Sequence, residues 1–292
     1  MKKLGIITLT FLLLGVSSAA AQDDCQNHER GGGECSVGSE APTTGDMMNV
    51  IRSGSPDRLM ATLEHGEMVD CYQCVPALME RALTDGDAEV REYSAWWLRK
   101  RSFGAGMAFR FFRLTLADDP DPVRRARAAM AIGEFLDPNG LPLLTDAATA
   151  DAAASVRASA VTALGRLNHS GGNAILARAM GDADGSVRLA ALKSVNIVNF
   201  FREFDALVPL LADSDVLIRR EAALLSGRFR LTAAVDTLAA LLRGDEDASV
   251  RRSAAWALGS IGGAEARAAL GEANGSETNQ QVLDAIEIAL LM

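Results

Sequence analysis

The sequence predicts an all-α protein, an α-solenoid (α-α superhelix) of stacked helix pairs, and three observations predict it. Hydrophobic residues make up 49% of the chain but aromatic residues only 5%, and the abundant alanine and leucine favour helices. A short residue pattern recurs about every 32 residues, a period typical of solenoids. Within each copy, apolar residues stand four apart, which places them on one face of a helix.

The first 21 residues have the features of a secretory signal peptide. Lys2 and Lys3 precede an apolar run from Leu4 to Val16, and small residues follow up to Ala21. The run is shorter than the roughly 20 residues that span a bilayer. We therefore expect cleavage after Ala21 and a location in a bacterial periplasm or outside the cell, with no membrane span. The alternative is an uncleaved amphipathic anchor.

Residues 22–45 are rich in Gly, Ser and acids and are interpreted as a flexible linker. Together with Cys71 and Cys74, the linker cysteines Cys25 and Cys35 allow two disulfides in an oxidising compartment, in three connectivities. Two local pairs are favoured, and the alternative is that both linker cysteines reach across to Cys71 and Cys74. Cys25, His28 and Cys35 could bind zinc in principle, but a disulfide is the preferred interpretation and no metal site is predicted.

The Cys71-x-x-Cys74 motif has two possible roles. Pro76 suggests that a helix begins near Cys74, and thiols at a helix N-terminus have a lowered pKa and can be redox-active. The motif lacks the strand–helix context of a thioredoxin fold, so a structural disulfide is favoured and a redox or sensing pair is the alternative. Val75 in place of histidine excludes a haem attachment site.

Residues 46–292 are predicted to form the solenoid, with 46–73 as its N-terminal cap and 279–291 as its C-terminal cap. Ser55-Pro56-Asp57 reads as a helix start. The repeated frame is clearest at Val156-Arg157, Ala160, Leu164 and Gly165. Its anchors, a β-branched residue followed in all but the last copy by arginine, are Val90, Val123, Val156, Val187, Ile218, Val250 and a degenerate Val282.

Each position of the frame has a predicted role. The anchor and the residues four and eight further on form a buried stripe, and the glycine at +9 can end the helix. An acid three residues before the anchor is placed to cap the helix N-terminus: Asp87, Asp184, Asp215 and Asp247. A short apolar helix precedes each of these, as in 76–83, 204–211 and 235–242. A helix pair cannot bury its own apolar face, so the pairs must stack.

The frame Asp-x4-Val-Arg-x2-Ala-x3-Leu-Gly resembles the HEAT-like repeat of the phycobilisome-lyase type, over most of residues 74–292. Four departures are visible: Gly133 comes one residue late, Arg99 and Asn196 replace glycine, and Ser226 replaces an apolar residue. The resemblance implies a solenoid. Deoxyhypusine hydroxylases share this type of repeat and bind iron through His-Glu pairs. The single such pair here, His28-Glu29, lies in the linker, so that activity is not expected. No cofactor motif supports bilin-lyase chemistry.

Charged residues recur in register in six copies. The acid five residues before the anchor and the arginine after it are expected to form hydrogen-bonded rows that fix the geometry between repeats. This structural ladder comprises Asp85, Arg91, Asp118, Arg124, Asp151, Arg157, Asp182, Arg188, Asp213, Arg219, Asp245 and Arg251.

Position +6 of the second helix lies opposite the buried stripe and carries tryptophan in two copies. Exposed tryptophans beside arginine are enriched at protein interfaces. The candidate partner-binding residues are Tyr93, Trp96, Trp97, Arg99, Lys100 and Trp256. The alternative is that these rings pack between helices.

The function predicted from these features is an exported, non-catalytic scaffold for a protein or peptide partner. The net charge of −9 argues against nucleic acid. No nucleophile with its base, phosphate loop or paired-carboxylate site is visible, and no cofactor is expected. The alternative is a redox or sensor protein that acts through Cys71 and Cys74, or a metal- or chromophore-associated relative of the hydroxylases or lyases.

Overall fold

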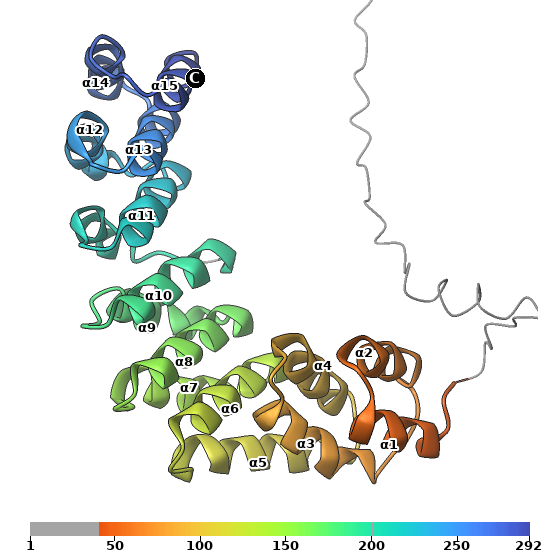
Figure 1. The fold of residues 1–292 in the computed structure, drawn as a ribbon. Helices are drawn as coiled ribbons and strands as arrows, with labels where there is room; N and C mark the ends of the chain where they lie inside the picture. The colour runs from red at the N-terminus through yellow and green to blue at the C-terminus, as the bar shows by residue number, and fades with distance from the viewer. Residues whose placement is uncertain (1–40, 200) are drawn as a thin grey trace, which may run out of the picture. The chain divides into compact units, whose positions relative to one another are not determined.

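The computed structural model describes residues 41–199 and 201–292 (Figure 1). The predicted signal peptide, nearly all of the predicted linker, and Cys25, His28 and Cys35 lie outside the described residues. Within the described ranges the regular structure is entirely helical. None of the helices found there is both long and apolar enough to cross a membrane.

The described helices form consecutive pairs. The first helix of each pair is α1 (Thr44–Ser53), α3 (Cys74–Thr84), α5 (Ala105–Asp118), α7 (Gly140–Ala150), α9 (Asn173–Ala179), the 3-10 turns η3 (Phe204–Ala206) and η4 (Val208–Ala212), α12 (Val235–Gly244) or α14 (Ala264–Asn274). The second is α2 (Pro56–His65), α4 (Ala88–Arg99), α6 (Pro122–Phe135), α8 (Ala154–Leu167), α10 (Gly185–Ile197), α11 (Val216–Arg228), α13 (Ala248–Ile261) or α15 (Gln280–Leu290).

Extensive packing occurs within a pair or between neighbouring pairs. The second helices pack in sequence as one row, and the first helices form the other row. This arrangement confirms the predicted α-solenoid, since each pair buries its apolar face against its neighbours.

The predicted stripe forms the core. Val156, Ala160 and Leu164 of α8 are fully buried, as are their counterparts in α10, α11 and α13. Asp87, Asp184, Asp215 and Asp247 each cap the following helix by accepting a backbone N–H. The predicted spacing and the predicted caps are therefore both confirmed.

The prediction that the +9 glycine ends the helix is wrong. Gly165 lies inside α8, which continues to Leu167, and Gly133, Gly227 and Gly259 also lie inside their helices. A Cβ atom on Gly165 would stand 2.7 Å from the Cβ of Ser194 in α10. The other three would meet the next second helix in the same way, at 2.7 to 2.8 Å. These glycines therefore allow neighbouring second helices to approach closely.

The two copies without this glycine pack less closely. Arg99 in α4 and Asn196 in α10 occupy the +9 position, and the junctions α4–α6 and α10–α11 are the two loosest between successive second helices from α4 to α15. At the first junction Arg99 reaches across to donate to the carbonyl of Glu134, at 2.7 Å. Arg99 thus bridges α4 and α6 at the position where glycine stands in the closer junctions.

The register predicted for the second copy is wrong by one residue. Val123 is 49% exposed, because Asp121 caps the helix and Pro122 begins it. Arg124 therefore occupies the anchor position, with Ala128 and Ile132 completing the buried stripe. Counted from Arg124, Gly133 stands at position +9, as in the other copies that carry this glycine. Its position one residue late, when counted from Val123, therefore indicated that the predicted anchor was one residue too early.

The segment 204–211, predicted as a helix, forms 3-10 turns instead. Pro209 near the start of η4 has no N–H to donate. The rings of Phe201, Phe204 and Phe229 pack together beside these turns.

Candidate functional site

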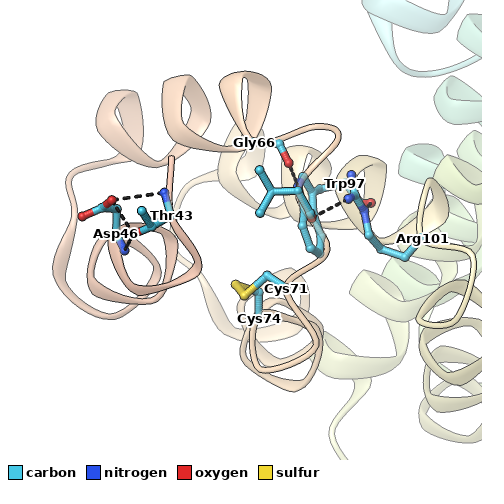
Figure 2. Close-up of a disulfide and its surroundings, with 8 residues drawn as sticks. Thr43, Asp46, Gly66, Cys71, Cys74, Trp97 and Arg101 are labelled. Carbon is cyan, nitrogen blue, oxygen red and sulfur yellow. Dashed lines mark hydrogen bonds between the residues drawn. A yellow bond between two sulfur atoms is a disulfide. The ribbon is translucent and has the colours of Figure 1, made fainter. Parts of the chain in front are cut away.

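The loop between α2 and α3 is fastened by a disulfide and by side chains from α4 (Figure 2). Cys71 and Cys74 are joined at the start of α3, with their Cα atoms 5.2 Å apart. Both residues are buried. The bond spans the loop end and the first turn of α3, as expected of a structural clamp, and it leaves neither sulfur as a free thiol.

Trp97 is a core residue, contrary to its prediction as a partner-binding residue. Its side chain is 0% exposed, and its indole N–H donates to the Gly66 carbonyl at 3.2 Å. The Arg101 guanidinium lies 3.8 Å from the centre of the Trp97 ring (Figure 2). It also donates to the carbonyls of Val69 and Glu67. Trp97 stands at position +7, which faces the preceding second helix, and this explains its burial.

The neighbouring Trp96 lines a surface groove. This acidic groove, about 390 Å³ in volume, is formed by Glu64 of α2, by Glu89, Glu92, Tyr93 and Trp96 of α4, and by Glu134 of α6. Four carboxylates and two aromatic rings thus share one hollow on the row of second helices. The groove extends over the α4–α6 junction, with Glu134 as its contribution from α6.

Local contacts hold the groove's rings in place. The Tyr93 hydroxyl donates to Glu64 at 2.8 Å, which raises the pKa of Tyr93. Tyr93 and Trp96 meet edge to face, with ring centres 5.8 Å apart. Lys100 lies over Trp96, 4.3 Å from the ring centre, and pairs with Glu67. The structure thus brings Tyr93, Trp96 and Lys100 together, with Arg99 bridging to α6.

The groove's carboxylates differ in their partners. Glu92 and Glu134 both bind Arg166 of α8. The Glu89 side chain has no hydrogen bond or ion pair with any residue between 41 and 292 that the structure describes. The Glu89 side chain is therefore available to pair with a cationic partner.

Trp256 lies apart from these residues, in a second groove along α11, α13 and α15. Its neighbours there include Arg220, Arg252 and Ile288, and the indole is 38% exposed. Of the candidate partner-binding residues, Tyr93 and Trp96 therefore line one groove and Trp256 lines another, on the same row of helices.

The structural ladder is present as rungs between successive repeats. In each rung an arginine donates Nε and Nη2 to the two oxygens of one carboxylate in the next repeat, at 2.7 to 3.1 Å. Nη1 donates to the carbonyl of the acid in its own repeat. The rungs are Arg125–Asp151, Arg157–Asp182, Arg188–Asp213, Arg219–Asp245 and Arg251–Glu277.

The ladder corrects the predicted set and extends it. Asp119 and Arg125 take the places predicted for Asp118 and Arg124, because of the one-residue shift in the second copy. Glu277 was missed, although it stands five residues before Val282. Its hydrogen bond from Arg251 lowers the pKa of Glu277 to about 2. Asp85 pairs with Arg81 of its own helix pair.

Across residues 41–199 and 201–292, no three His, Cys, Asp or Glu side chains gather as a metal site would require.

The packing of consecutive helix pairs and the rungs between them define an α-solenoid repeat protein. Models of HEAT repeats match residues 75–154, 109–196 and 204–291. The chain belongs to the HEAT-repeat family.

Solved structures share the fold at low sequence identity. YibA of Escherichia coli has a TM-score of 0.57 and 15% identity, over 86% of this chain and 93% of that one. Kap95p, in a structure with RanGDP, has a TM-score of 0.54 and 12% identity, over 82% of this chain and 36% of that one. The phycocyanin lyase CpcE–CpcF of a Nostoc species is also similar, with a TM-score of 0.41 and 20% identity, over 74% and 93% of the two chains. A search of curated proteins gave no match.

Proposed function

We propose that this protein is an exported, non-catalytic scaffold that binds a positively charged segment of a protein partner in the acidic groove. The observation that carries the proposal is the groove itself, where Trp96 and Tyr93 stand among four carboxylates. Aromatic residues supply most of the energy at protein interfaces, and complementary charge selects the partner. Kap95p, a solenoid of similar fold, is named as binding RanGDP, which supports protein binding as the use of such a surface.

The chemistry of the groove favours lysine or arginine separated by apolar residues. Glu89 can pair with a cation, and the Trp96 ring offers contact area to an aliphatic side chain or to the stem of a lysine. The redox alternative has weaker support, since Cys71 and Cys74 are disulfide-bonded and buried, and thiol exchange needs access to a sulfur.

Binding is tested with the peptide acetyl-Gly-Lys-Leu-Lys-Leu-Gly-amide, titrated by calorimetry into the purified full chain. We expect saturable binding that weakens at least tenfold in Trp96→Ala, about 1.4 kcal/mol, because the ring contact is lost. Glu89→Gln should weaken binding severalfold and reduce its salt dependence. Far-UV circular dichroism checks that each variant is folded.

Two matched variants serve as controls. Trp256→Ala removes the tryptophan of the second groove, and Glu265→Gln removes an acid in the first turn of α14 that has no partner among the described residues. Both should bind as the parent does. Equal loss in Trp256→Ala, or equal binding of a peptide with glutamate in place of lysine, would contradict the proposed groove.

Export has its own test. In protein recovered from the envelope or the medium of the producing bacterium, mass spectrometry should find Gln22 as the first residue. Alkylation before reduction should leave Cys71 and Cys74 unmodified. A full-length chain that starts at Met1 and stays in the cytoplasm would refute export while leaving the groove untouched.

A further inference from the structure

In each rung the Nε and Nη2 groups of the arginine form a fork that holds one carboxylate. Within the described part of the chain, Arg91 is the one arginine of the predicted ladder whose fork faces no carboxylate. Its Nη1 donates to the carbonyls of Asp85 and Gly86 at 2.8 and 3.0 Å, as in the other repeats. The acid that should meet its Nε and Nη2 is Asp119, but Asp119 accepts Nε of Arg124 at 2.9 Å. Arg124, which stands at the anchor position of the second copy, therefore binds the carboxylate that would complete the Arg91 rung.

A second arginine lies nearby with spare donors. Arg127 of α6 gives Nη1 to the Leu83 carbonyl at 2.7 Å, and its other N–H groups meet no acceptor among the described residues. Burial, and then the charge of Arg127, lower the pKa of Arg91, whereas the arginines of the five rungs have a raised pKa. The two guanidinium groups therefore repel each other, and among the described residues no carboxylate accepts a hydrogen bond from both.

Both arginines line a pocket of about 240 Å³ between α4 and α6. Its remaining wall is largely apolar and includes Ala82, Ala95, Ala126 and Met130, with the serine hydroxyls of α8 at one side. Glu92 and Glu134 also border it, but Arg166 binds both and offsets their charge. The pocket thus combines two guanidinium groups that have N–H donors to spare with an apolar wall that can contact a hydrocarbon chain.

We propose that this arginine pocket binds a carboxylate carried on a small apolar group. Guanidinium forks match the planar, two-oxygen geometry of a carboxylate, which is how the same arginine position is satisfied in five other repeats. The apolar wall would cover the adjoining carbon chain. The pocket shares Glu92 and Glu134 with the acidic groove, but the arginine forks that would hold the ligand line the pocket alone. The site would hold either a free organic acid or the C-terminus of a polypeptide.

The test follows the arginine Nε–H signals of the full chain by NMR, assigned with Arg91→Lys and Arg127→Lys, during titration with butyrate. We expect saturable shifts at Arg91 and Arg127, with none from the isosteric amide butyramide and weaker binding of inorganic phosphate. Absence of saturable shifts, equal shifts from butyramide, or tighter binding of phosphate would each overturn the proposal.

Val123 supplies a matched pair of variants without risk to the fold, because it is half exposed and lines the pocket. Val123→Glu places a carboxylate one turn before Arg127. This carboxylate should bind the Arg127 guanidinium and weaken butyrate binding at least tenfold. Val123→Gln changes the same wall of the pocket without adding a charge, so it should bind butyrate at least tenfold more tightly than Val123→Glu. Equal binding in the two variants would overturn the proposal.

Acetyl-trialanine with a free C-terminus, compared with its amide, distinguishes the two sources of the carboxylate. Tighter binding of the free-acid peptide than of butyrate assigns the pocket to a polypeptide terminus, and equal or weaker binding assigns it to a small acid. Either result supports a carboxylate site if butyrate itself binds.

Discussion

Replacing Gly165 with leucine should destabilise the protein by about 3 kcal/mol or more, the upper part of the range for overpacked cores. A Cβ atom at this position would stand 2.7 Å from the Cβ and 2.8 Å from the Oγ of Ser194. Ser194 also donates to the Val161 carbonyl at 3.1 Å, so a shift of α10 would break a buried hydrogen bond. Urea unfolding followed by circular dichroism measures the loss.

Gly271→Leu is the matched control. Gly271 lies on the exposed face of α14, and no atom stands within 4 Å of a Cβ placed there. The same substitution should therefore stabilise the protein, by about 1 kcal/mol or less, because leucine is the better helix former. Similar losses in the two variants would show that the close approach of α8 and α10 is not what glycine provides.

Asp182→Asn should cost about 2 kcal/mol, because it removes a charged partner from two hydrogen bonds with Arg157, both 2.8 Å long. Asp182 also accepts the backbone N–H of Asp184 at 2.8 Å, so the loss affects the turn that starts α10. Asp118→Asn is the control, since Asp118 is exposed and has no partner among the described residues. That variant should lie within about 0.5 kcal/mol of the parent.

The pH dependence of this difference follows from the direction of the pKa shift. The hydrogen bond from Arg157 lowers the pKa of Asp182 in the folded state. Its contribution to stability is therefore complete above the pKa of the unfolded chain, about 3.9, and is lost as pH falls through the lower folded value. The gap between parent and Asp182→Asn should shrink from pH 6 to pH 2. A gap that grows on acidification would contradict the ladder.

The fold could be predicted because helical periodicity fixes which positions are buried. The spacing of four residues places Val156, Ala160 and Leu164 on one face of the helix, and that face is buried in the structure. The register of the second copy could not be read in the same way, since Val123 imitates the anchor and the helix start is decided by Asp121 and Pro122. The glycine's role was misread because a helix end and a close helix contact both favour the same residue.

The site was only partly predictable, for a related reason. Trp96 and Trp97 are adjacent in sequence but differ by about 100° around the helix, so one lines a groove and the other faces α2. Glu64 belongs to the cap, outside the repeated frame, and no pattern links it to Tyr93. The fork of Arg91 is open because Arg124 binds Asp119, and no pattern in the sequence indicates that pairing.

An unbiased peptide selection tests the central claim most directly, that the α2–α4–α6 surface binds a cationic protein segment. Random peptides displayed on phage are selected against the purified full chain, with Trp96→Ala used for counter-selection. We expect enrichment of lysine or arginine alternating with apolar residues. Enrichment of acidic peptides, or of peptides that bind the parent and Trp96→Ala equally, would contradict it.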